Sequence, residues 1–165
     1  MAMVDELLFI KRFREQKAEK DMLRTRFDLQ QAHEREESAQ DNLQSFRVQA
    51  EADELRWYGD LCSRLVKPRE ILAVQEDVAV LRANEAQLAI GLEQAQVEHA
   101  AAQQRYAGAT DQHRLASAAK NKFVELADSF HAAEARERER RDELELEEVA
   151  GQVRLRDGTE EQEHG

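Results

Sequence analysis

Residues 71–130 read ILAVQEDVAV LRANEAQLAI GLEQAQVEHA AAQQRYAGAT DQHRLASAAK NKFVELADSF, and this stretch decides the fold. One set of eighteen positions recurs in it at alternating spacings of three and four, and fourteen of the eighteen are apolar. The set is Ile71, Val74, Val78, Leu81, Glu85, Leu88, Leu92, Ala95, His99, Ala102, Tyr106, Ala109, His113, Ala116, Lys120, Phe123, Ala127 and Phe130. A seven-residue repeat of this length predicts a left-handed coiled coil.

A second stripe with the same spacing lies upstream, and nine of its twelve positions are apolar. It consists of Ala18, Met22, Thr25, Leu29, Ala32, Glu36, Ala39, Leu43, Phe46, Ala50, Asp53 and Trp57. Each stripe can therefore cover the other.

Pro68 is the only proline of the chain and lies between the two stripes. Proline disfavours helix in the residue before it and is well tolerated in the first turn of a new helix. We expect helices over residues 4–62 and 69–150, joined by a turn at 63–68. Two long helices joined by a short turn pack antiparallel, so the sequence predicts an all-α, two-helix coiled-coil hairpin. In this register Phe46 faces Glu85 and Ala32 faces His99.

The end of the chain lacks the stripe. Residues 135–148 are rich in both signs of charge and are expected to remain helical through charge pairs. Gly151 and then Asp157-Gly158 are expected to break the helix. The sequence thus predicts a disordered acidic tail over residues 151–165.

Composition excludes several other classes of protein. Charged residues make up 36% of the 165 residues and aromatic residues 5%, too much charge and too few rings for a compact globular core. No apolar run approaches the ~18 residues of a membrane-spanning helix, and the first residues lack the features of a secretion signal. The one cysteine, Cys62, cannot form an internal disulfide. We expect a soluble cytoplasmic protein.

The charge is distributed unevenly along the chain, whose net charge is −11. From residue 142 onward there are nine acidic and two basic residues, a net charge of −7. Residues 10–26 contain seven basic and three acidic residues, a net charge of +4. The negative overall field argues against nucleic acid as a partner.

Motifs for catalysis are missing from the sequence. There is no glycine-rich phosphate loop, and His33-Glu34 lacks the second histidine of a zinc-protease motif. His99 and His113 are two heptads apart, about 21 Å along a helix, which is too far to share a metal ion. We expect no enzymatic activity, no cofactor and no metal.

Apolar residues on the outward face are more informative, because a two-helix coiled coil has no need of them. They are Phe13, Phe27, Val48, Leu55, Ile90 and Val97. Scattered exposed apolar residues are normal, but two outward phenylalanines on the basic segment suggest a docking surface. Trp57, Tyr58, Leu61 and Leu65 form a second candidate patch near the turn, or a plug that closes the hairpin.

Three segments resemble the YscO/FliJ family of small coiled-coil stalk proteins in bacterial type III secretion systems, and within it the HrpO-like branch. Residues 8–24 (LFIKRFREQKAEKDMLR) resemble the start of the family's first helix. Residues 81–88 (LRANEAQL) and 121–127 (NKFVELA) resemble the middle and end of its second helix.

This resemblance implies a non-enzymatic stalk or adaptor whose paired termini bind a hexameric secretion ATPase. The other end would reach toward the export gate, and some members also bind secretion chaperones. The protein would then lie at the cytoplasmic face of the secretion apparatus and be a monomer when isolated. Carried onto this sequence, the ATPase end comprises Ile10, Arg12, Phe13, Arg14, Lys17, Lys122, Phe123 and Leu126. The gate end comprises Trp57, Tyr58 and Leu61.

Three alternatives remain open from the residues alone. The same heptads could form a generic homodimeric scaffold, which light scattering would detect. The chain could be a partly disordered protein that folds on contact with a partner, with low helicity in isolation. An enzyme is the most distant of the three.

Overall fold

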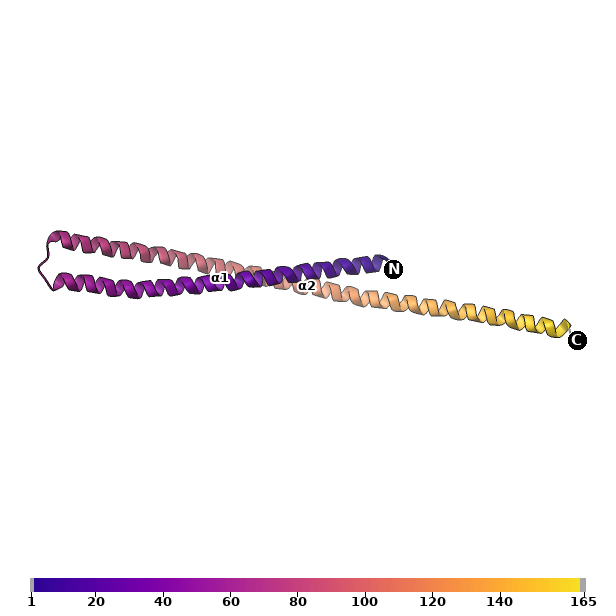
Figure 1. Ribbon diagram of the computed structural model, residues 1–165. Coiled ribbons are helices and arrows are strands. Elements are labelled where there is room, and N and C mark those ends of the chain that lie inside the picture. Colours follow the sequence, from indigo (N-terminus) through magenta and orange to yellow (C-terminus); the bar gives the residue numbers. More distant parts are fainter. Residues whose placement is uncertain (1, 164–165) are drawn as a thin grey trace. The chain divides into compact units, whose positions relative to one another are not determined.

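A computed structural model describes residues 2–163. It contains two helices, α1 (Ala2–Cys62) and α2 (Pro68–Glu163), which pack against each other as a hairpin (Figure 1). The predicted all-α fold of two long helices is therefore confirmed.

The chain divides into two compact units, and each helix contributes to both. The first contains the residues up to Gln16 together with those from Arg114 onward, and we call it the terminal unit. The second, Lys17–His113, contains the turn, and we call it the turn unit.

The seam of the turn unit follows the sequence stripes closely. Every position of the upstream stripe, from Ala18 to Trp57, is buried or half-buried. On α2 the same holds from Val74 to His113, while Ile71, beside the turn, is 39% exposed. The apolar repeat thus identifies the face that each helix buries.

The buried core is small and consists mostly of alanine. In the turn unit the buried residues are Ala32, Leu43, Ala50, Ala95 and Ala102. Two helices cover each other along one line only, so a large side chain on the seam remains open to solvent at its edges. A small residue on the seam can be covered almost entirely, which explains why alanine dominates the buried positions.

The cross-helix contacts agree with the predicted register to within about one helical turn. Arg47 Nε donates to a carboxylate oxygen of Glu85 at 2.9 Å, next to the predicted Phe46–Glu85 pair. The rings of His33 and His99 lie 5.3 Å apart, next to the predicted Ala32–His99 pair.

Glu85, a polar residue that interrupts the seam on α2, has a partner across it. Glu85 accepts hydrogen bonds from Arg47 and, at 3.1 Å, from Arg82. Arg82 also donates to Glu54 at 2.8 Å. Among the described residues, no buried side-chain nitrogen or oxygen lacks a hydrogen-bond partner.

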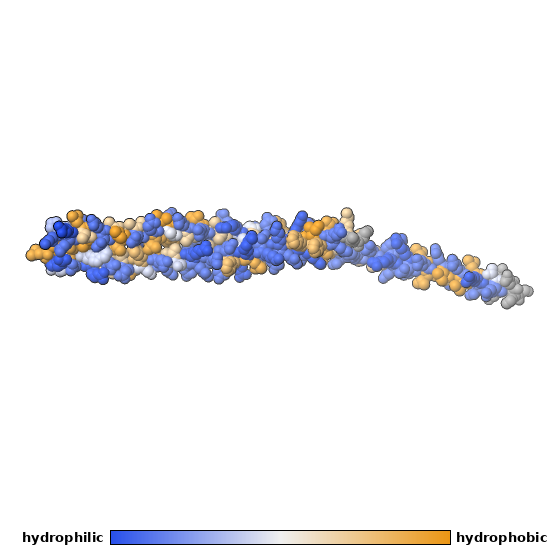
Figure 2. Space-filling view, turned by 45° about the horizontal axis from the view of Figure 1, so that its top comes forward, coloured by the Kyte–Doolittle hydropathy of each residue, from blue (hydrophilic) through white to orange (hydrophobic). Residues whose placement is uncertain are grey.

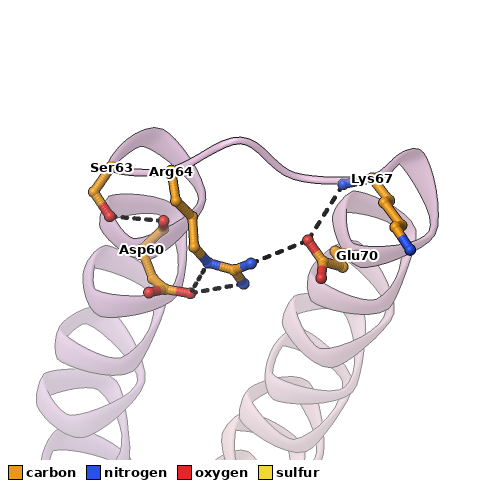
Figure 3. Close-up of polar contacts among 5 residues, drawn as sticks. All are labelled: Asp60, Ser63, Arg64, Lys67 and Glu70. Atoms are coloured by element: carbon orange, nitrogen blue, oxygen red, sulfur yellow. Dashed lines mark hydrogen bonds and ion pairs between the residues drawn. The ribbon is translucent and has the colours of Figure 1, made fainter.

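The turn is closed by one arginine and by a helix cap (Figure 3). Arg64 donates to Asp60 on α1 at 3.2 Å and to Glu70 on α2 at 3.2 Å. Hydrogen bonding to Asp60 first, and then the charge of Glu70, raises the pKa of Arg64. The Glu70 carboxylate also accepts a hydrogen bond from the backbone N–H of Lys67 at 3.3 Å, which caps α2 just before Pro68.

The terminal unit has a seam of its own on α1. Val4, Leu8, Lys11 and Glu15 continue the same spacing toward the N-terminus and are all half-buried. The apolar pattern did not reveal this extension, because Lys11 and Glu15 are charged. The structure supplies the reason: Lys120 pairs with Glu15 at 3.0 Å.

The prediction of a disordered tail from residue 151 differs from the structure. Helix α2 continues through Gly151 and Gly158 to Glu163, and neither glycine has a positive φ. An isolated glycine costs a helix only about 1 kcal/mol relative to alanine, and Val153, Arg154 and Leu155 between the two glycines are compatible with a helix. Residues 164 and 165 lie outside the described part of the chain.

Within residues 2–163, neither helix contains a stretch apolar enough to cross a membrane. The same part of the chain holds no cluster of three or more residues suited to a metal ion.

Leu43 is the largest side chain in the buried core, with 4% of its surface exposed. We expect Leu43→Ala to lower the free energy of unfolding by about 2–4 kcal/mol, because it removes buried methyl groups and leaves a cavity. Urea unfolding followed by circular dichroism measures this change. Leu55→Ala, at a position that is 69% exposed, is the matched control and should change stability by less than about 0.5 kcal/mol. Equal effects of the two substitutions would contradict the proposed seam.

The carboxylate of Glu85 makes stability depend on pH. The hydrogen bond from Arg47 lowers the pKa of Glu85, and burial opposes this shift without reversing it. Because the pKa is lower in the folded state, the stabilisation is present above the unfolded pKa of about 4.3 and is lost as the pH falls through the folded value.

Glu85→Gln should therefore lower the melting temperature at pH 7, and its difference from the wild type should shrink as the pH falls through the folded pKa of Glu85. Thermal unfolding at a series of pH values measures this. Glu93→Gln, at an exposed position of the same helix, is the control and should show no such dependence. A constant difference from pH 7 to pH 3 would rule out the ion pair as its source.

Candidate functional site

Seven of the eight residues predicted for the ATPase end are exposed in their own units. Phe13 is 60% exposed, Leu126 59% and Ile10 42%. Arg12, Arg14 and Lys122 are also exposed. With the half-buried Phe123, these residues form what we call the N-terminal surface, on the terminal unit: Ile10, Arg12, Phe13, Arg14, Lys122, Phe123 and Leu126.

Lys17 and Phe123 differ from the other six predicted residues. Lys17 is exposed as well, but it is the first residue of the turn unit and so lies outside the N-terminal surface. Phe123 is half-buried, and the Lys11 ammonium lies 5.7 Å from the centre of its ring. This cation–π contact connects α1 to α2 within the surface.

The sequence analysis missed Phe9. This residue is 70% exposed and precedes Phe13 by four positions, so the two rings lie on the same side of α1. Asp5, Glu6, Phe9 and Ile10 line a shallow depression beside them. The missed signal was the pair of phenylalanines at i and i+4, because Phe9 lies outside the f positions of the heptad.

The N-terminal surface combines exposed rings with arginines. Arg12 and Arg14 form no ion pair with another described residue, so their guanidinium groups are available to a partner. A surface of this kind is suited to an acidic protein face with apolar pockets, because aromatic and arginine side chains contribute most of the energy at interfaces.

The residues predicted for the gate end lie beside the turn, in the turn unit. Trp57 and Leu61 are half-buried, whereas Tyr58 is 40% exposed. The first two therefore close the hairpin, and Tyr58 is the member that faces solvent. We call these three residues the turn surface.

A depression next to the turn surface connects it with the charged seam. It is lined by Arg47, Ala50, Glu51, Glu54, Leu55, Tyr58, Arg82 and Glu85. Leu55 is 69% exposed, so it and Tyr58 add an apolar edge to a floor of paired charges.

The outward apolar residues predicted from the heptads are all exposed. The fractions are 60% for Phe13, 59% for Phe27, 65% for Val48, 69% for Leu55, 47% for Ile90 and 65% for Val97. The four that follow Phe27 are scattered over the turn unit.

His99 lies on the seam, half-buried, with Nδ1 2.5 Å from a carboxylate oxygen of Glu36. The neighbouring His33 lies 3.9 Å from Glu37. His113 is half-buried and Cys62 exposed. The contact between Glu36 and His99 connects the two helices, whereas His33 and Glu37 both lie on α1.

Comparison with known proteins agrees with this geometry. The family model of the type III secretion protein YscO matches residues 4–152. The crystal structure of the type III secretion protein YscO from Vibrio parahaemolyticus has the same fold, with a TM-score of 0.80 and 24% sequence identity. The match covers 89% of this chain and 92% of that one. No curated protein matches the chain.

The family match spans both helices, the turn and the N-terminal surface, and so confirms the resemblance seen in the sequence. The chain belongs to the YscO family of type III secretion proteins.

Proposed function

We propose that this protein is a non-enzymatic stalk or adaptor that binds the hexameric ATPase of a type III secretion system through the N-terminal surface. Membership of the YscO family supports a role in secretion. The observation that carries the ATPase end is the combination of exposed Phe9 and Phe13 with Arg12 and Arg14, which form no ion pair among residues 2–163, on one short segment of α1.

The proposed action is binding without chemistry. A single hairpin in a sixfold ring contacts its subunits unequally. Such a contact can shift the nucleotide states of individual subunits, because a ligand biases an equilibrium by its differential affinity for the two states.

The turn surface is the proposed contact for the export gate, with Tyr58 as its exposed member and Trp57 and Leu61 supporting it. Secretion chaperones are further proposed partners, by the resemblance to the family. The proposed place of action is the cytoplasmic face of the secretion apparatus. The isolated protein is proposed to be a monomer, which light scattering tests against the homodimeric scaffold.

Reversing the charge of Arg12 and Arg14 together, to Glu, tests the ATPase end. We expect stimulation of the secretion ATPase to fall at least fivefold, because two cations facing an acidic surface become two anions. Helicity should be unchanged, since both side chains are exposed. A coupled ATPase assay and circular dichroism measure the two quantities.

The double variant Arg69→Glu with Arg105→Glu is the matched control. It makes the same change in net charge at exposed positions of the turn unit and should leave stimulation intact. Full stimulation by the Arg12/Arg14 variant, or an equal loss in the control, would reject the N-terminal surface as the ATPase contact.

A further inference from the structure

The last part of α2 has no packing partner in the described chain. Between described residues, the last ion pair that joins the two helices is that of His131 Nε2 and Asp5 Oδ1, 3.3 Å apart, and α1 begins at Ala2. From Arg138 to Glu160 every residue is exposed. About six turns of helix therefore extend without a second helix to cover them.

This segment nevertheless has an apolar face. Leu146, Val149 and Val153 are spaced by three and then four residues, as on one side of a helix, and they are 69%, 57% and 51% exposed. The depression on this side is lined by Val149, Gln152, Val153, Leu155, Arg156 and Thr159. Figure 2 shows hydrophobic side chains grouped on this part of the chain, between hydrophilic stretches.

The apolar face is bordered by unneutralised acid. Residues 142–160 contain seven acidic residues and two basic ones, a net charge of −5. Glu137, earlier on the same helix, forms ion pairs with two arginines: Arg140 lies 3.0 Å and Arg141 3.7 Å from its carboxylate. The acidic residues that follow form no ion pair with another described residue: Glu143, Glu145, Glu147 and Glu148.

The helix in this segment is not stabilised by tertiary packing among the described residues. Most helices are stabilised by tertiary packing of an apolar face, and this one has no packing partner among the described residues. Glu143 and Glu147 are four residues apart and repel each other, while Gly151 and Gly158 each weaken the helix. A partner that brought apolar contacts and positive charge would compensate for all three effects.

We propose that residues 142–159 form a docking helix for a basic amphipathic helix of another protein. Apolar residues of that partner would cover Leu146, Val149 and Val153, and its lysines or arginines would face Glu143 and Glu145, which lie on either side of this face. A second copy of this chain is a poorer occupant, because it would place acidic flanks against acidic flanks. This surface is separate in sequence from the N-terminal surface, and its proposed role goes beyond the stalk function.

The test uses the full-length protein and three fluorescent peptides of equal length, followed by fluorescence anisotropy. The first is a basic amphipathic helix with leucines spaced by three and four and lysines beside them. The second has the same composition in scrambled order, and the third has glutamates in place of the lysines. We expect the first peptide to bind at least tenfold more tightly than the other two, and less tightly at high salt.

Two variants locate the binding site. Val149→Asp with Val153→Asp should weaken binding of the first peptide at least tenfold. Changing Glu143, Glu145, Glu147 and Glu148 to Gln should also weaken it, while keeping or increasing helicity, so that a loss cannot be attributed to melting of the helix. Val48→Asp with Val97→Asp is the matched control, because both valines are 65% exposed on the turn unit, and it should bind normally.

Three results would overturn the proposal. Equal binding of the scrambled peptide would show that net charge alone accounts for binding. An equal loss of binding in the Val48/Val97 control would show that the effect is not specific to residues 142–159. A dimer in light scattering that Val149→Asp with Val153→Asp dissolves would make a second copy the occupant. None of these results bears on stimulation of the ATPase, so the two proposals fail independently.

Discussion

Mutual coverage of two apolar seams is the constraint on which this structure depends. In the turn unit, each helix has one face that must leave water and only the other helix to cover it. The described residues contain no third element that packs on the two helices. The close approach of the two helices along one line therefore takes the place of a globular core. That geometry favours alanine at most of the buried positions and leaves larger residues such as Phe46 half-buried. It also leaves the outward faces free for other proteins.

Sequence periodicity predicted the hairpin because helix packing repeats every seven residues, and a single proline marks where the repeat must stop. The apolar stripe did not predict the part of the seam where charged side chains replace apolar ones. Lys11 and Glu15 occupy the seam of the terminal unit, and only the contact between Glu15 and Lys120 shows why they are tolerated there. A pattern of hydrophobic residues carries no information about ion pairs between distant segments.

The end of α2 was misjudged for a different reason. Gly151 and Gly158 were predicted to break the helix, although neither adopts a backbone conformation that is incompatible with a helix. The candidate surfaces were predicted in part, because outward phenylalanines can be counted from the heptad. Phe9 and the burial of Trp57 depend on how far each helix is covered, which spacing alone does not determine.

The paired charges across the seam of the turn unit have a mechanical consequence. Sliding one helix past the other by a heptad, about 10 Å, would leave most apolar contacts nearly equivalent, since the repeat returns to itself. It would separate Glu85 from Arg47 and Glu36 from His99. Sliding of one helix along the other is therefore resisted by these few polar contacts across the seam. A pull on one helix is transmitted to the other instead of being lost as slippage.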